Sequence, residues 1–232
     1  MSGSTEPIKD YCLLGTKHSH SPIAGQCSDA YESGDYATAL REWKPLAEKG
    51  FANAQHNLGQ IYRRVQRAPQ GYKTAVKWYR LAAKQGNAAA QSNLGWMYDL
   101  GKGVPKNYKT AVKWYRLAAE QGDARAQYLL GLMYAKGQGV PQDDKTALKW
   151  WTLAAEQGDA LAQFNLGAMY GTGRGVIQDN VYAHMWGNLA ASNGNENGGK
   201  VRDLVAKLMN SSQLKKAQKL ALECIRKKYK GC

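Results

Sequence analysis

Two side chains of this sequence, Ser212 and Lys215, have the spacing of a nucleophilic catalytic pair. Ser212-Gln213-Leu214-Lys215 fits the Ser-x-x-Lys signature of penicillin-recognising enzymes, in which the serine is the nucleophile. The Ser-Asp-Asn and Lys-Thr-Gly motifs that accompany it in such enzymes are missing from the sequence. We therefore interpret Ser211 or Ser212 as a helix N-cap and predict no catalytic residue, which leaves a β-lactamase-like hydrolase as a distant alternative.

Four residues near the N-terminus are of types that bind zinc, namely Cys12, His18, His20 and Cys27. Their spacing matches no zinc motif that we can defend. Residues 1–22 also show no hydrophobic periodicity, so we expect a mobile segment there. We predict no metal site and no cofactor.

The chain is strongly basic, with a formal net charge of +14. Residues 71–142 and residues 200–232 each carry a large excess of Lys and Arg, whereas the rest is slightly acidic. Such a charge attracts anionic partners. It supports two hypotheses, an acidic protein partner or an anionic polymer such as nucleic acid or a cell-envelope polymer. Because no RNA- or DNA-binding motif is present, we do not expect nucleic acid.

Hydropathy predicts no transmembrane segment, because no apolar run approaches the roughly 20 residues that cross a bilayer. Near the N-terminus the longest apolar run is Cys12-Leu13-Leu14, which is too short for a signal peptide. We expect a cytoplasmic protein, or a periplasmic or secreted one if an upstream signal is missing from this sequence.

A 36-residue repeat positions most of the charged residues. Tryptophans, alanines and glycines recur at this period, and YKTAVKWYRLAA occurs twice, from Tyr72 and from Tyr108. The recurring positions are Trp78, Trp114, Trp150 and Trp186; Ala75, Ala111, Ala147 and Ala183; Gly50, Gly86, Gly122, Gly158 and Gly194. Self-similarity at this period predicts stacked helical units.

Each unit is predicted to be a pair of helices. In the third unit, Asn107 to Gln121 holds no helix breaker, Gly122 ends the first helix, and Asp123 caps a second one that runs to about Lys136. The units are 35–70, 71–106, 107–142, 143–178 and a diverged fifth at 179–199 onward; a cap helix at 23–34 precedes them, and 200–232 holds capping helices at 200–209 and 213–229.

Two features indicate that the units stack. Gly59, Gly95, Gly131 and Gly167 recur inside the second helix. Glycine there costs about 1 kcal/mol relative to alanine, so we expect a neighbouring helix to approach too closely for a Cβ. On the first helix of the third unit, the apolar residues cover an arc of about 220°, which predicts burial on two sides.

The repeat resembles the Sel-one-like repeat (SLR) family of TPR-like solenoids. The third unit carries its pattern at Ala111, Trp114, Tyr115, Ala118, Ala119, Gly122, Ala124, Ala126, Gln127, Leu130, Gly131, Tyr134, Gly137, Gly139 and Val140. The resemblance covers about residues 28–194 and implies an all-α, right-handed superhelix that acts as an adaptor for protein complexes. The first unit departs from the pattern, with Val65-Gln66-Arg67 in place of Gly-x-Gly, so its connection must differ.

The first helices carry a basic stripe that we predict to bind the partner. In TPR-like solenoids these helices line the concave groove, so the resemblance implies that the stripe faces an acidic segment of another protein. The alternative is a solvated surface that only keeps the array soluble. The stripe consists of Lys73, Lys77, Arg80, Lys109, Lys113, Arg116, Lys145 and Lys149.

The four cysteines lie outside the repeats. Seven residues separate Cys224 from Cys232, and Tyr229 and Gly231 between them can turn the chain back on its helix. In cysteine-rich relatives of the family, the same spacing bridges a helix end to the segment after the helix. We predict a Cys224–Cys232 disulfide in an oxidising compartment, and more weakly a Cys12–Cys27 disulfide; in a cytoplasmic protein a buried free thiol at Cys224 is favoured.

Overall fold

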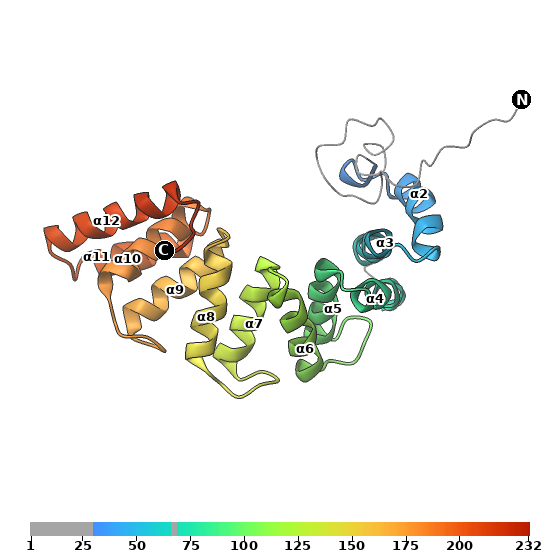
Figure 1. Cartoon of the computed structure of the whole chain (residues 1–232), viewed down its shortest axis with the longest axis horizontal. Coiled ribbons are helices and arrows are strands. Elements are labelled where there is room, and N and C mark those ends of the chain that lie inside the picture. The colour runs from blue at the N-terminus through green and yellow to red at the C-terminus, as the bar shows by residue number, and fades with distance from the viewer. Residues whose placement is uncertain (1–29, 66–68) are drawn as a thin grey trace, which may run out of the picture. The chain divides into compact units, whose positions relative to one another are not determined.

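The computed structural model describes residues 30–65 and 69–232, and these ranges contain α-helices and no strand (Figure 1). The fold is the all-α repeat solenoid that the sequence predicts. The expected mobile segment, Cys12, Cys27, the two nearby histidines and most of the cap helix lie outside the described residues. The helices are α2 (Tyr36–Glu48), α3 (Ala52–Val65), α4 (Pro69–Lys84), α5 (Ala88–Leu100), α6 (Tyr108–Glu120), α7 (Ala124–Lys136), α8 (Asp144–Ala155), α9 (Ala160–Thr172), α10 (Asn180–Ser192), α11 (Glu196–Ala206) and α12 (Ser211–Arg226).

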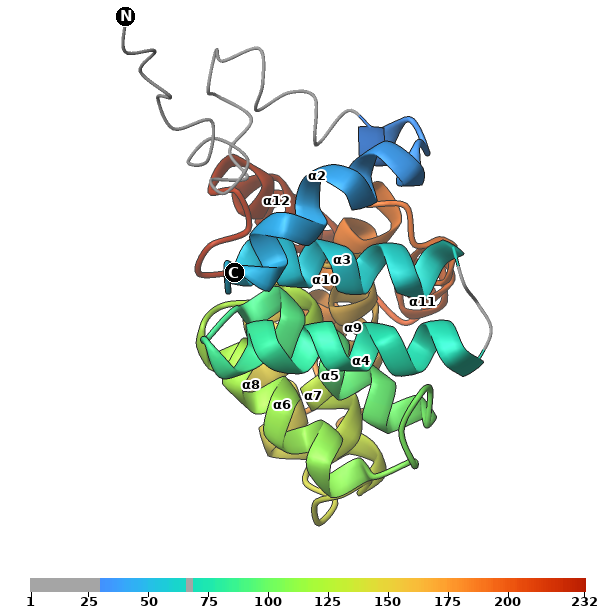
Figure 2. The same ribbon diagram turned by 90° about the vertical axis from the view of Figure 1, so that its right-hand side faces the viewer.

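The chain divides into two compact units, of which the first ends at Asn107 and the second begins at Tyr108. In the first unit α3 lies between α2 and α4 (Figure 2), over a core that includes Trp43, Leu58 and Ile61. In the second unit consecutive helices from α6 to α11 pack against each other, and α12 packs against α10. Each unit therefore buries its own core.

The helix ends follow the turn chemistry of the repeat. Asp123 caps α7 as predicted, because its Oδ1 accepts a hydrogen bond from the backbone N–H of Ala126 at 2.7 Å. Gly137 ends the same helix at φ 64°, a left-handed conformation that favours glycine. A Cβ on Gly139 would lie 2.5 Å from the backbone carbonyl of Tyr108. The Gly-x-Gly element thus lets the connection pass close to the first helix.

The connection of the first repeat differs from the others, as expected. Because α3 ends at Val65 and α4 begins at Pro69, only residues 66–68 separate them. Residues 101–107 separate α5 from α6. The missing Gly-x-Gly therefore goes with a shorter connection.

Three of the four recurring glycines inside the second helices, Gly59, Gly131 and Gly167, lie against an aromatic ring or the backbone of a neighbouring helix, which confirms the predicted close approach there. A Cβ on Gly59 would lie 2.6 Å from ring atoms of Tyr79, and a Cβ on Gly131 would lie 2.5 Å from Nε1 of Trp151. At Gly167 the neighbours are backbone atoms of α10 at 3.2 Å. Glycine at these positions lets a first helix seat on the second helix before it.

Buried glutamine side chains link one repeat to the next. In the second unit Gln127 donates from Nε2 to the carbonyl of Ala119 at 3.1 Å, and its Oε1 accepts from Gln157 at 2.8 Å. Gln157 also donates to the carbonyl of Gly122 at 3.0 Å. Helix-end carbonyls that would otherwise lack partners are satisfied in this way.

First helices pack on two sides, since α4 contacts α3 and α5, and α8 contacts α7 and α9. On α6 the buried face is nevertheless narrower than the apolar arc. The buried residues of α6 are Ala111, Val112, Tyr115, Ala118 and Ala119, and they span an arc of only about 120°. Trp114 is half-buried, and Leu117 is 45% exposed. The apolar arc was wider than the buried one because it included this leucine, which lies on the exposed face beside the lysines.

The terminal helices begin earlier than predicted. α11 starts at Glu196 and α12 at Ser211, and the N-cap of α12 is Asn210 rather than a serine. Asn210 and Gln213 form a reciprocal capping box, in which each side chain accepts from the backbone N–H of the other at 2.9 Å. Ser212 is therefore not needed as a cap.

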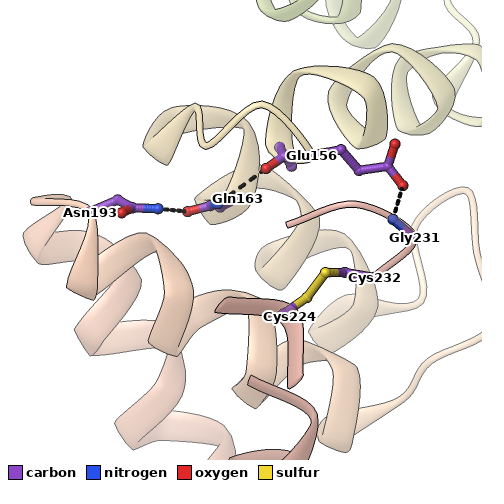
Figure 3. Close-up of a disulfide and its surroundings, with 7 residues drawn as sticks. Glu156, Gln163, Asn193, Cys224, Gly231 and Cys232 are labelled. Carbon is purple, nitrogen blue, oxygen red and sulfur yellow. Dashed lines mark hydrogen bonds between the residues drawn. A yellow bond between two sulfur atoms is a disulfide. The ribbon is translucent and has the colours of Figure 1, made fainter. Parts of the chain in front are cut away.

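A disulfide between Cys224 and Cys232 closes the C-terminal turn onto α12 (Figure 3). The Cα atoms of the two cysteines are 5.5 Å apart, and Cys224 is buried. The turn also contacts the repeats, because Gly231 donates to Glu156 at 3.1 Å and Tyr229 donates to Asn193 at 3.0 Å. These contacts hold α12 against α8 and α10.

Reduction of this disulfide is expected to destabilise the second unit by at most about 2.5 kcal/mol, since a short closed loop restricts the unfolded chain only modestly. The measurement is urea unfolding of a Cys12→Ser/Cys27→Ser variant with and without a reductant. Thiol titration of the same variant, purified from an oxidising compartment, should find no free cysteine. Two free thiols there would contradict the bond.

Candidate partner-binding site

All eight side chains of the predicted basic stripe are exposed. Lys73, Lys77 and Arg80 lie on α4 in the first unit. The other five lie in the second unit, with Lys109, Lys113 and Arg116 on α6, and Lys145 and Lys149 on α8. That they act together as one stripe remains a prediction.

Two arginines of the stripe are held by tyrosines of the same repeat. Arg116 donates from Nη2 to the hydroxyl of Tyr134 at 2.6 Å. One repeat earlier, Arg80 makes the same bond to Tyr98 at 3.1 Å. The corresponding residue of α8 is Thr152, and the following tyrosine, Tyr170, instead stacks on Tyr182 with ring centroids 5.2 Å apart. The arginine–tyrosine pair is thus present at equivalent positions of two repeats.

A hollow of about 530 Å³ lies between α6, α7 and α8, and we call it the second-unit hollow. The residues that line it are Arg116, Glu120, Tyr134, Thr146, Lys149, Trp150 and Leu153. Of the predicted stripe, only Arg116 and Lys149 reach it. They stand beside an indole, a phenol ring and a leucine, so this surface combines positive charge with apolar area.

One other polar group of the hollow, Thr146, has a partner. The hydroxyl of Thr146 donates to Asp143 Oδ2 at 2.6 Å. The hydrogen bonds from Thr146 lower the pKa of the Asp143 carboxyl, which keeps it ionised at the N-terminus of α8. Arg116 Nη2 is bonded to Tyr134 and the charge of Lys149 acts on Asp143, yet both basic side chains line the hollow and are exposed there.

Sequence reasoning missed the apolar part of this surface. Leu81, Leu117 and Leu153 recur at the repeat period on the first helices and are each more than two-fifths exposed. The apolar arc predicted for the third unit's first helix included Leu117, because its spacing is that of an apolar helix face. In each case a lysine stands four residues before the leucine, on the same face of the helix. This pattern indicates a face that is exposed and carries both charged and apolar residues.

The catalytic alternative gains no support from the geometry. Ser212 and Lys215 are both exposed, in the first two turns of α12. Within residues 30–65 and 69–232, no group of three or more His, Cys, Asp or Glu residues is arranged to hold a metal ion. In the same part of the chain, no helix is long and apolar enough to span a membrane.

Comparison with known families identifies the repeat. A family model described as the Sel1 repeat matches residues 52–87, 88–123, 124–159 and 160–195. The chain belongs to the Sel1 repeat family. The matched segments have the period of our units but a different starting point, because each begins at a second helix and ends after the next first helix.

Solved structures of Sel1 repeat proteins are similar to the chain. A Sel1 repeat protein from Oxalobacter formigenes is 30% identical, with a TM-score of 0.71 and 87% of each chain covered. A protective antigen of uropathogenic Escherichia coli with an SLR fold is 31% identical, with a TM-score of 0.56 over 87% of this chain. The match spans only 52% of that antigen. No curated protein matches the chain.

Proposed function

We propose that this Sel1 repeat protein is a non-catalytic scaffold that binds an acidic segment of a protein partner in the second-unit hollow. Sel1 repeat proteins are in general scaffolds for protein interactions. The observation that carries the more specific proposal is the lining of the hollow, where Arg116 and Lys149 flank Trp150 and Leu153. Arginine and tryptophan are the residue types that most often dominate binding energy at protein interfaces.

The chemistry of the hollow favours a peptide over a uniform polyanion. Arg116 and Lys149 attract carboxylates, and Trp150 and Leu153 offer area for an apolar side chain next to them. Glu120 lines the same hollow. It repels a polymer that is charged at every unit, whereas it can accept a hydrogen bond from a peptide N–H group. A segment that combines acidic and aromatic residues supplies the carboxylates, the apolar side chain and the backbone N–H groups that these residues can bind.

Charge reversal at the hollow is expected to weaken binding of such a peptide at least tenfold. The probe is a short peptide of repeating Asp-Glu-Phe that carries a neutral dye, and affinity is measured by fluorescence anisotropy. The variant is Arg116→Glu/Lys149→Glu. Lys109→Glu/Lys145→Glu is its matched control, because it makes the same charge change on the same two helices at exposed residues outside the hollow.

The control should bind within about threefold of the wild-type protein, since exposed charges outside a contact act mainly through long-range attraction. Equal weakening by both variants would contradict a site confined to the hollow and would favour the longer basic stripe, to which Lys109 and Lys145 belong. A DNA oligonucleotide that binds more tightly than the peptide, with a steep salt dependence, would favour the polymer hypothesis instead.

A further inference from the structure

A second hollow, of about 540 Å³, lies in the first unit and takes no part in the site proposed above. Its lining residues are Tyr36, Arg63, Arg64, Tyr72 and Trp96. We call it the first-unit hollow. The lining residues come from the start of α2, the last turn of α3, and the helices α4 and α5. Two guanidinium groups and three aromatic rings therefore converge from four helices.

Aromatic rings hold both guanidinium groups. Arg63 lies over the indole of Trp96, 5.6 Å from the ring centroid, and Arg64 lies over the ring of Tyr31 at 5.2 Å. A guanidinium that stacks on a ring uses its flat face, so the N–H donors in its plane can still form hydrogen bonds. One donor of Arg64 binds the hydroxyl of Tyr36, and its other donors remain for a ligand. The Nε atom of Arg63 is buried without a hydrogen-bond partner among the described residues, which leaves the Nη atoms of this group as its outward donors.

No acid balances this charge within the described residues. Neither arginine forms an ion pair there, and no Asp or Glu lines the first-unit hollow. The C-terminal end of α3 supplies about half an elementary charge of negative potential, against two full positive charges. The hollow is therefore net positive and, unlike the second-unit hollow, contains no carboxylate.

We propose that the first-unit hollow is a second binding site for acidic peptides, in which Arg63 and Arg64 bind a side-chain carboxylate and Tyr36, Tyr72 and Trp96 receive the neighbouring aromatic residue. Planar guanidinium groups match the two oxygens of a carboxylate. This inference rests on the proposed function for the class of ligand, but it concerns a different set of residues. It makes the protein a two-site scaffold for one acidic partner segment in each unit.

Stoichiometry tests this site independently of the second-unit hollow. Titration calorimetry with the repeating Asp-Glu-Phe peptide should find two peptides per wild-type chain. Arg63→Gln/Arg64→Gln and Arg116→Glu/Lys149→Glu should each retain one, and the combined variant should retain none. If only Arg116→Glu/Lys149→Glu loses peptide binding, the first-unit site is wrong and the proposed function stands. If only Arg63→Gln/Arg64→Gln loses peptide binding, the first-unit site stands and the second-unit hollow is not the binding site.

Two further variants separate carboxylate recognition from plain charge. Arg63→Lys/Arg64→Lys keeps both charges but removes the planar donors, so we expect peptide affinity at the first-unit hollow to fall at least tenfold. Lys44→Gln/Lys84→Gln removes two exposed charges of the same unit outside the hollow and should leave affinity unchanged. Wild-type peptide affinity in the Arg63→Lys/Arg64→Lys variant would overturn the proposal. So would tighter binding of a phosphoserine peptide of equal charge, because it would assign the hollow to phosphate.

Discussion

Replacing Gly131 by alanine is expected to lower the free energy of unfolding by about 2 kcal/mol, whereas the same change at Gly171 should raise it by up to about 1 kcal/mol. A Cβ at residue 131 would lie 2.5 Å from Nε1 of Trp151, which is buried and donates to the carbonyl of Tyr128 at 3.0 Å. Burial and this hydrogen bond therefore keep the ring from moving away from an added methyl group. Overpacking then exceeds the gain in helix propensity.

The Gly171→Ala variant is a matched control within the same unit. A Cβ there would meet Ala183 and Val205 at 3.6 Å, which is ordinary van der Waals contact. The two variants should thus differ by about 3 kcal/mol in opposite directions. The measurement is urea unfolding followed by far-UV circular dichroism, with a Trp151→Leu background to test the coupling. If Gly131→Ala is as stable as Gly171→Ala, the close approach of the two helices is wrong.

Acid is expected to destabilise the first unit through His56, by close to 3 kcal/mol between about pH 7 and pH 4. Burial is the main cause that lowers the pKa of this imidazole to about 4, and the charge of Arg63 acts in the same direction. The side-chain amides of Gln60 and Asn93 lie 3.3 and 3.1 Å from Nε2. They can donate to a neutral ring but not to a second ring N–H.

The sign follows from the two protonation states. Above its ordinary pKa of 6.5 the imidazole is neutral in both the folded and the unfolded chain, so its pKa shift costs nothing there. Below 6.5 the unfolded chain binds a proton that the folded chain refuses until about pH 4, so stability falls through this window. A His56→Gln variant should lose less stability than the wild-type protein over the same range. Parallel pH profiles for the two proteins would show that His56 does not carry the effect.

The sequence predicts the helices well and the binding surface only in part. The sequence alone reveals the repeat period, N-cap residues such as Asp123 and helix glycines such as Gly131. Their effects are local, because an N-cap binds its own helix and a missing Cβ matters only to the group packed against it. Burial of a first helix depends on how far the adjacent repeat reaches around it, which a helical wheel does not contain. Leu117 was misplaced for this reason.

The hollows were beyond sequence reasoning because each draws residues from separate helices. Arg63 and Trp96 are brought together only by the packing of α3 to α5, and neither belongs to the repeated basic positions. The lysines, in contrast, were visible at once because they recur. A search for repeated charge therefore finds Arg116 and Lys149 but passes over a site that occurs once.

For the proposed peptide, the bond between Arg116 and Tyr134 bears on the entropy of binding. A free arginine side chain samples many rotamers, and about 2 kcal/mol of that freedom is at stake when a ligand orders it. Because the phenol already restrains Arg116 at 2.6 Å, part of this ordering is complete before any partner arrives. In the proposed complex, Tyr134 thus lowers the side-chain entropy that Arg116 loses on binding. Thr152, at the equivalent position of the next repeat, has no guanidinium that a tyrosine could restrain. Equivalent positions of successive repeats therefore differ in the rigidity of the surface that they present.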